Sequence, residues 1–258
     1  MESIRILGAF GGKGVNMTTT TIQVNEHIVI DAGNIVGPLG PDGAKVDHIF
    51  LSHSHLDHIA DIPFLIDAFF EAREQPIFIY GLEETLMDLK EYIFNWKVWP
   101  DFNQIQLIHN TMNAIMFVPV EEWEEIGLDE VTLKTVPSNH IVPTLGYAIW
   151  KNGRGILYTA DTYLNDDTWE MVNGDPSITT VIIDVSFPSR LDKLAEVSKH
   201  LTPALLDQEL KKLKRDDVTV HVYHLKPNYV PQVTKELEEL GALRNGGRVL
   251  KDGDIVEF

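Results

Sequence analysis

Three histidines and one aspartate lie within six consecutive residues of this chain. The segment is His-Ser-His-Leu-Asp-His, at residues 53–58. Imidazole nitrogens and carboxylate oxygens bind divalent metal ions, and two histidines separated by one residue can point in the same direction. The aspartate also suits the first turn of a helix that begins at this point. We interpret four residues of the segment as metal ligands: His53, His55, Asp57 and His58.

Three further candidates each follow a run of residues that is typical of a buried strand: His140, Asp161 and His224. The segment 53–58 also follows such a run. Functional groups in α/β proteins collect where strands end. We therefore expect these residues to meet at one edge of the sheets.

The number and type of donors indicate two metal ions. Five histidines and two aspartates are too many for one four- or five-coordinate ion, but they suit two ions that share a carboxylate. The chain has no cysteine, so the ions are zinc in the first place, with manganese or iron as alternatives. The first ion takes His53, His55 and His140, the second takes Asp57, His58 and His224, and Asp161 bridges them.

The elements that must position these residues form a mixed α/β pattern. Strands are predicted at 4–7, 20–24, 27–31, 48–52, 76–80, 104–108, 131–136, 146–150, 155–159, 180–185, 219–223 and 253–258. Helices are predicted at 59–72, 83–94, 203–214 and 231–240. The order is too irregular for a purely parallel sheet, and hairpins are present. We expect one domain over residues 1–258, with two mixed sheets packed face to face and helices outside.

The composition and net charge of the chain indicate which kinds of binding partner to expect. Of the 258 residues, 44% are hydrophobic, as in ordinary globular proteins. The 21 basic and 39 acidic residues give a net charge of −18, which argues against bulk nucleic-acid binding, because that needs a basic field. The sequence shows neither a secretory signal nor an apolar membrane span, so we expect a cytoplasmic protein without membrane contact. The acidic run at 121–125 is expected to be a solvated helix or loop.

The segment HSHLDH, followed in order by His140, Asp161 and His224, resembles the metallo-β-lactamase superfamily. The resemblance extends over nearly the whole chain. It implies an αββα sandwich of two mixed sheets, with a dinuclear site at one edge of the paired sheets. This fold agrees with the architecture that the predicted strands and helices favour.

Within that superfamily, the chain resembles the class II cyclic-nucleotide phosphodiesterases. The segments that carry the resemblance are 53–59, 94–102, 199–203 and 222–227. The chain departs from the family pattern where Asp61 and Pro63 interrupt an apolar run. The resemblance implies hydrolysis of cyclic AMP or cyclic GMP to 5′-nucleotides by a metal-bridging hydroxide. Another ester, a lactone, a thioester or a tRNA 3′ end stays open as the substrate, since fold and metals do not fix it.

The resemblance also implies roles for residues around the metal ligands. His200 is expected to bind a phosphate oxygen or protonate the leaving alkoxide; alternatively, it helps to cap the helix that follows. Asp57 is expected to orient the hydroxide as well as to bind metal. Asp184 either orients His200 or simply ends a strand. We expect Asn34 to line the substrate pocket, and His48 either to support the ligands from behind or to have a structural role in the sheet.

Two other segments have open interpretations. The glycine-rich segment 8–14 lacks the spacing of a phosphate-binding P-loop, and we expect it to form a loop near the mouth of the site. Phe94, Trp96 and Trp99 suit stacking on a purine, but they equally suit the core or a contact between subunits. The resemblance is consistent with a homodimer.

Overall fold

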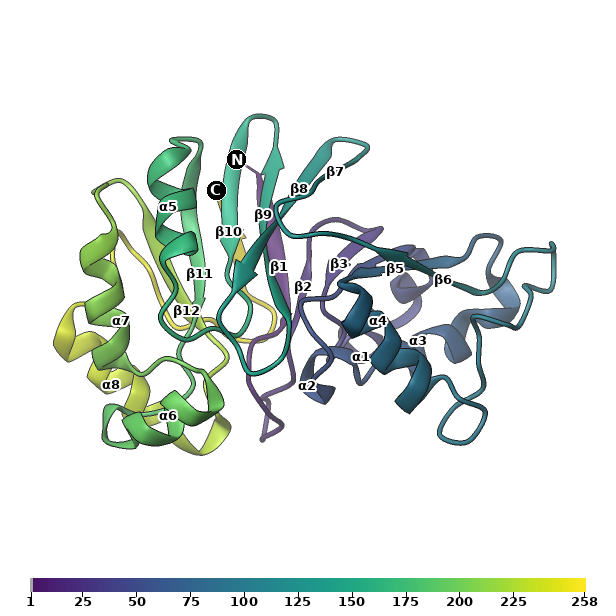
Figure 1. Ribbon diagram of the computed structural model, residues 1–258, viewed down its shortest axis with the longest axis horizontal. Coiled ribbons are helices and arrows are strands. Elements are labelled where there is room, and N and C mark those ends of the chain that lie inside the picture. Colours follow the sequence, from purple (N-terminus) through teal and green to yellow (C-terminus); the bar gives the residue numbers. More distant parts are fainter. Residues whose placement is uncertain (1) are drawn as a thin grey trace.

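Two mixed β-sheets face each other, and helices cover the outer face of each (Figure 1). The structure is a computed structural model that describes residues 2–258. Within these residues, a seven-stranded sheet has the order β13-β1-β2-β3-β4-β5-β6, and a six-stranded sheet has the order β12-β11-β10-β9-β8-β7. This arrangement confirms the predicted αββα sandwich.

The strands of the two sheets come from different parts of the chain. The first sheet contains β1 (Ser3–Gly8), β2 (Thr21–Gln23), β3 (Ile28–Ile30), β4 (His48–Phe50), β5 (Ile77–Gly81), β6 (Ile115–Pro119) and β13 (Ile255–Glu257). The second sheet contains β7 (Glu125–Leu128), β8 (Val131–Ser138), β9 (Thr144–Lys151), β10 (Arg154–Tyr158), β11 (Ile178–Asp184) and β12 (Thr219–Tyr223). Strands β10, β11 and β12 run parallel, and β8 has the same direction because both β8 and β10 are antiparallel to β9. Their carboxyl ends therefore meet at one edge.

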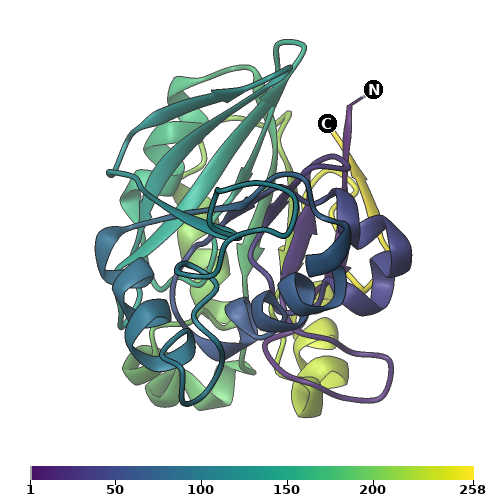
Figure 2. The ribbon, with the colours of Figure 1, turned by 90° about the vertical axis from the view of Figure 1, so that its right-hand side faces the viewer.

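The helices divide between the two outer faces. Those of the first half are α1 (Val36–Leu39), α2 (Leu56–Ile59), α3 (Ile62–Phe69) and α4 (Glu83–Asp88). Those of the second half are α5 (Asp166–Gly174), α6 (Asp192–Ser198), α7 (Pro203–Glu209) and α8 (Val230–Leu240). Figure 2 shows the helices of the first half in front of the sheets. Helix α2 lies at the lower edge of the sandwich in Figure 1, between the two halves.

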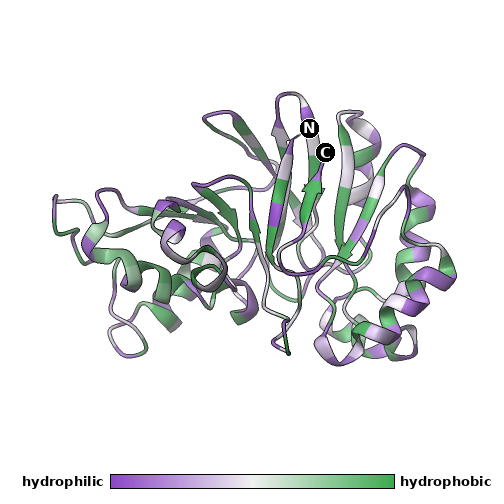
Figure 3. Cartoon of the chain, turned by 180° about the vertical axis from the view of Figure 1, so that it is seen from behind, coloured by the Kyte–Doolittle hydropathy of each residue, from purple (hydrophilic) through white to green (hydrophobic). Residues whose placement is uncertain are grey.

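Apolar side chains alternate along the strands and so fill two layers of core. In β4, Phe50 packs into the cluster between the sheets, whereas Ile49 packs with Leu65 beneath the helices of the first half. In Figure 3 the strands are accordingly coloured largely as hydrophobic, while the helices contain both hydrophobic and hydrophilic residues. Phe50, the last residue of β4, therefore helps to pack the two sheets against each other just before the 53–58 segment.

The hydroxyl of Tyr147 helps to join the two sheets directly before the 53–58 segment. Tyr147 in β9 is fully buried and donates a hydrogen bond of 2.7 Å to the carbonyl of Leu51. We expect Tyr147→Phe to lower the free energy of unfolding by about 1–3 kcal/mol, because this carbonyl loses its partner in the core. Urea unfolding measures the effect. The exposed Tyr92→Phe is the control and should change stability by less than about 0.5 kcal/mol; equal midpoints for both variants would contradict the prediction.

Several predicted elements differ from the structure. Of the predicted helix 59–72, only Ile62–Phe69 form a continuous α-helix, α3, because Ile59 ends α2 and Phe70–Ala72 form a 3₁₀ turn. Between α2 and α3, the Asp61 carboxylate accepts hydrogen bonds from the backbone N–H groups of Ile35 and Val36, and Pro63 lies in the first turn of α3. The predicted strand 104–108 is wrong: it makes only an isolated bridge, within its own loop. The acidic run 121–125 leads into β7, which was not predicted, and neither were β6, α5 and α6.

None of the helices within residues 2–258 combines the length and the apolar character that crossing a membrane requires.

Candidate metal centre

The strand ends deliver the predicted ligands to one place. The 53–58 segment follows β4, with His55 as the residue before α2 and Asp57 in the first turn of that helix. His140 follows β8, Asp161 follows β10, and His224 follows β12. All seven predicted ligands belong to groups whose donor atoms lie within 4.8 Å of one another. The rule of strand ends therefore predicted which residues cluster, and their role as metal ligands stays a prediction.

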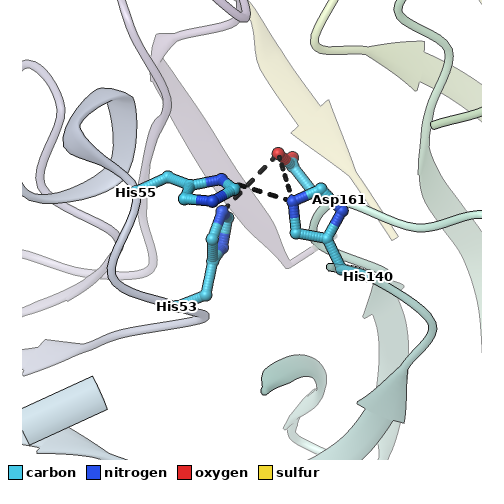
Figure 4. Close-up of side chains that lie close together, drawn as sticks. All are labelled: His53, His55, His140 and Asp161. Atoms are coloured by element: carbon cyan, nitrogen blue, oxygen red, sulfur yellow. Dashed lines mark hydrogen bonds and ion pairs between the residues drawn. The ribbon is translucent and has the colours of Figure 1, made fainter. Parts of the chain in front are cut away.

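The first group contains His53, His55, His140 and Asp161 (Figure 4). The Oδ2 atom of Asp161 lies 3.7 Å from Nε2 of His53 and 3.9 Å from Nε2 of His140. Nδ1 of His55 lies 3.3 Å from Nε2 of His140. Three imidazoles and one carboxylate oxygen thus face a common centre.

The second group contains Asp57, His58 and His224. Nε2 of His224 lies 3.3 Å from Nε2 of His58 and 3.4 Å from Oδ2 of Asp57. The other oxygen of Asp161, Oδ1, lies 3.4 Å from His58 and 3.3 Å from His224. The two oxygens of Asp161 therefore face different groups, as a bridging carboxylate would.

These residues fit bound divalent metal. Nε2 of His53 is completely buried and has no hydrogen-bond partner among residues 2–258, although it faces Asp161. A buried polar atom without a partner costs about 1–3 kcal/mol, which a metal ion at this position would offset. Nitrogen and carboxylate donors without thiolate are also the set that zinc, manganese and iron accept.

Most of the histidines are held by hydrogen bonds on the nitrogen that faces away from the centre. Nδ1 of His53 contacts the hydroxyl of Ser52, Nδ1 of His58 the carboxylate of Asp31, Nδ1 of His140 the carbonyl of Lys199, and Nδ1 of His224 the hydroxyl of Ser186. Such contacts fix the ring orientation, which leaves Nε2 of each ring available as a ligand. His55 is the exception, since its Nδ1 faces His140.

The electrostatics of the site depend on which histidines contact carboxylates. Burial lowers the pKa of His58, but the charges of Asp161 and Asp31 outweigh burial and raise that pKa well above its ordinary value. Burial lowers the pKa of His140 to about 4. The neighbouring carboxylates thus favour the protonated form of His58, whereas burial favours the neutral form of His140. Metal binding has to displace the proton on His58, so metal affinity rises with pH.

His200 and Asp184 form a pair beside the ligands. Nδ1 of His200 lies 2.7 Å from Oδ2 of Asp184, and the ring of His200 stacks on that of His224 at 5.3 Å between centroids. This contact favours the interpretation that Asp184 orients His200, which stays a prediction. These two residues also form a third group with Asp161 and His224 that has metal-ligand spacing.

Other predicted residues lie away from the ligands. The amide of Asn34 donates to the carbonyl of Leu7 and the hydroxyl of Thr18, so its role in binding substrate stays a prediction without a contact to support it. His48 does not support the metal ligands: it begins β4, at the end opposite to the 53–58 segment, and contacts Tyr80.

The aromatic segment is divided between core and surface. Phe94 is buried in the core of the first half, whereas Trp96 is 60% exposed, and Trp99 packs edge-on against Phe64. The structure therefore assigns Phe94 to the core and leaves stacking on a purine as a prediction for Trp96 and Trp99.

Sequence analysis missed Asp31, which organises the ligands from behind. Its fully buried carboxylate contacts His58 at 2.8 Å and accepts hydrogen bonds from the backbone N–H and hydroxyl of Ser52 and from the hydroxyl of Tyr158. The signal was available, because Asp31 ends a predicted strand that lies parallel to β4. Ser186, which links Asp184 to His224, had no such signal.

Asp31 permits a test of this support. We expect Asp31→Asn to weaken metal binding about 10–100-fold, because the ring of His58 loses the carboxylate that orients it and increases its basicity. Competition with a fluorescent chelator measures the affinity. The exposed Asp216→Asn serves as the control and should bind metal as the parent does. An unchanged affinity in Asp31→Asn would show that Asp31 has only a packing role.

The backbone is strained at several positions in this site. Asp31, Ala160, Lys199 and His224 adopt left-handed conformations, with φ of 58°, 55°, 54° and 66°. For residues other than glycine this costs about 1–3 kcal/mol each. Ala160, which follows β10, directly precedes Asp161, and Lys199, which ends α6, directly precedes His200. The strain therefore occurs immediately before two functional side chains.

Comparison with known proteins gives the family. A model described as "Beta-lactamase superfamily domain" matches residues 27–242, which is most of the chain. The chain therefore belongs to this superfamily and, with its αββα fold and His/Asp clusters, is a hydrolase of the metal-dependent metallo-β-lactamase type.

The individual relatives include two kinds of enzyme. The chain is 26% identical to a 3′,5′-cyclic-nucleotide phosphodiesterase of Aliivibrio fischeri, over 98% of this chain and 91% of the relative. It is 27% identical to a probable 3′,5′-cyclic-nucleotide phosphodiesterase of Yersinia pestis over 72% of its own length, and this match spans only 58% of the relative. A ribonuclease Z of Methanococcus maripaludis is 42% identical, over only 40% of this chain and 31% of the relative.

Among solved structures, yeast PDE1 superimposes over the whole of both chains with a TM-score of 0.82 and 16% identity. At that identity the likeness shows the fold alone.

Proposed function

We propose that this protein hydrolyses 3′,5′-cyclic nucleotides, such as cyclic AMP or cyclic GMP, to 5′-nucleotides at a site with two divalent ions. The observation that carries the proposal is the placement of Asp161, whose two oxygens face two separate groups of ligands beside His200 and Asp184. The similarity to proteins named cyclic-nucleotide phosphodiesterase supports the substrate class.

The chain supplies one set of donors for each ion. His53, His55 and His140 would hold the first, Asp57, His58 and His224 would hold the second, and Asp161 would contact both. Ions bound there, zinc in the first place, supply positive charge that polarises a phosphoryl group and makes water more acidic.

His200 is suited to transfer a proton in the reaction. Because its Nδ1 contacts Asp184, its Nε2 is the free nitrogen. From Nε2 the protonated ring donates to the oxygen that leaves phosphorus, which prevents the accumulation of an alkoxide. Asp184 balances the charge of the protonated ring and holds it in one orientation. Asp57 would accept a hydrogen bond from the attacking water and so direct it toward phosphorus.

A direct assay tests the proposal. Protein loaded with zinc or manganese is incubated with cyclic AMP and cyclic GMP, and in parallel with bis-p-nitrophenyl phosphate, a lactone and a thioester. We expect cyclic nucleotides to be hydrolysed fastest and a chelator to abolish the reaction. Cleavage of the lactone or thioester without cleavage of cyclic nucleotides would assign the same site to a different substrate.

A nuclease that acts on tRNA 3′ ends is the second candidate. It is favoured by the short segment of high identity to ribonuclease Z. The net charge of −18 argues against it, because binding a large polyanion requires a basic surface. A precursor tRNA added to the same assay distinguishes the two, and we expect no cleavage of it.

A further inference from the structure

We propose that the ammonium group of Lys226 binds the phosphate of the substrate, as an anion-binding residue at the rim of the metal centre. This inference rests on the proposed phosphodiesterase function but is tested separately from it. Lys226 lies two residues after His224 in the sequence. Its Nζ is 3.8 Å from Oδ2 of Asp57, so it lies next to two members of the second group of proposed ligands.

The backbone of Lys226 is held by hydrogen bonds, whereas its ammonium group has donors to spare. The backbone N–H of Lys226 donates to the carbonyl of Ser186, and its own carbonyl accepts from Tyr229, so the residue is fixed at its base. Its side chain is 27% exposed, and apart from the ion pair with Asp57 no hydrogen bond of the ammonium is found among residues 2–258. Its N–H donors are therefore available to a ligand that reaches the metal centre.

The glycine-rich segment that sequence analysis left without a function makes room for this group. A Cβ on Gly11 would lie 2.7 Å from Nζ of Lys226 and 2.6 Å from Cε1 of His224. Only glycine therefore allows the loop to pass so close to both side chains. A Cβ on Gly12 or Gly14 would lie 3.3 Å or 3.1 Å from the ring of Pro227, the residue after Lys226. The loop thus closes the rim around the ammonium.

Charge explains why a cation is needed in a site with many acids. Asp31, Asp57, Asp161 and Asp184 place four carboxyl groups at this site; two divalent ions would offset part of this acidity, and His200 pairs with Asp184. A phosphodiester adds one negative charge, and the ammonium of Lys226 is the group at the rim that balances it. Lysine binds phosphate as a point charge, and a hydrogen bond between charged partners is stronger than one between neutral groups.

The test compares Lys226→Met with Lys226→Arg and with a control, Lys235→Met, in which an exposed lysine of α8 is lost with the same change of net charge. Each metal-loaded protein is titrated with inorganic phosphate by calorimetry, and its metal content is measured. We expect Lys226→Met to bind phosphate about tenfold or more weakly. Lys226→Arg should recover part of the affinity, and Lys235→Met should bind as the parent does. Metal content should be unchanged in all of them.

Kinetics provide a second readout. With bis-p-nitrophenyl phosphate, we expect Lys226→Met to raise KM about tenfold and to change kcat much less, while hydrolysis of the neutral p-nitrophenyl acetate stays the same. Phosphate binding by Lys226→Met equal to the parent's, no phosphate binding by the metal-loaded parent, or loss of metal from Lys226→Met would each overturn the inference. Failure to hydrolyse cyclic nucleotides, with the phosphate result as expected, would overturn only the proposed function.

Discussion

Replacing Asp161 with asparagine is expected to lower kcat/KM for a phosphodiester more than 100-fold and to reduce the bound metal. Residues that merely orient a ligand are worth about 10–100-fold, and Asp161 contacts both groups of ligands directly, so its removal should cost more. Asparagine keeps the size of the side chain, which limits the effect on packing. Rates are measured with bis-p-nitrophenyl phosphate, and metal content by mass spectrometry.

The control for Asp161→Asn is Asp216→Asn, which removes the same charge from an exposed position. It should retain full activity and metal. Circular dichroism of both variants checks that the fold is intact. If Asp161→Asn keeps both its metal and its rate, the carboxylate does not bridge two ions, and the assignment of the two ligand sets fails.

The second large effect is expected for His200→Ala, with kcat lower by about 10²–10⁴-fold, the usual value of a positioned acid or base. The structure supports this role because Asp184 holds Nδ1 of His200 at 2.7 Å. Hydrolysis of a reactive ester that needs no proton for its leaving group should be affected much less. Parallel assays with a phosphodiester and p-nitrophenyl acetate measure this difference.

Measuring the metal content of His200→Ala tests whether His200 is itself a metal ligand. His200 also belongs to a group with metal-ligand spacing, together with Asp161, Asp184 and His224. We expect His200→Ala to keep its metal, because the two proposed ligand sets are complete without it. Loss of an ion from this variant would show that His200 is a ligand and not a proton donor. The exposed His109→Ala is the matched control.

The clustering of the candidate metal ligands was predictable because their positions follow local rules. The spacing of His53, His55, Asp57 and His58 is visible in one short segment, and the rule of strand ends locates the others. The strands that deliver them are apolar runs with clear boundaries. The sheet pairing then converts a linear pattern into a cluster, because parallel strands end at the same edge.

The supporting residues were not predictable in the same way. Ser186 is an ordinary serine until the fold brings Asp184 and His224 to it. His48 is only five residues before His53 in the sequence, but it begins β4, whereas His53 follows the end of that strand. The extended strand therefore separates the two side chains, so His48 does not reach the candidate ligands. Helix α5 is polar over most of its length, and it is tertiary packing of Trp169 that orders it.

The left-handed residues Ala160, which follows β10, and Lys199, which ends α6, have a consequence for the evolution of this chain. Glycine at Ala160 or Lys199 would relieve local strain, yet it would also loosen the backbone that aims Asp161 and His200. Selection for thermal resistance and selection for turnover therefore act in opposite directions at these positions. Laboratory evolution for heat tolerance alone should therefore select glycine at these positions early. The resulting protein should be more stable but should have lost hydrolytic activity.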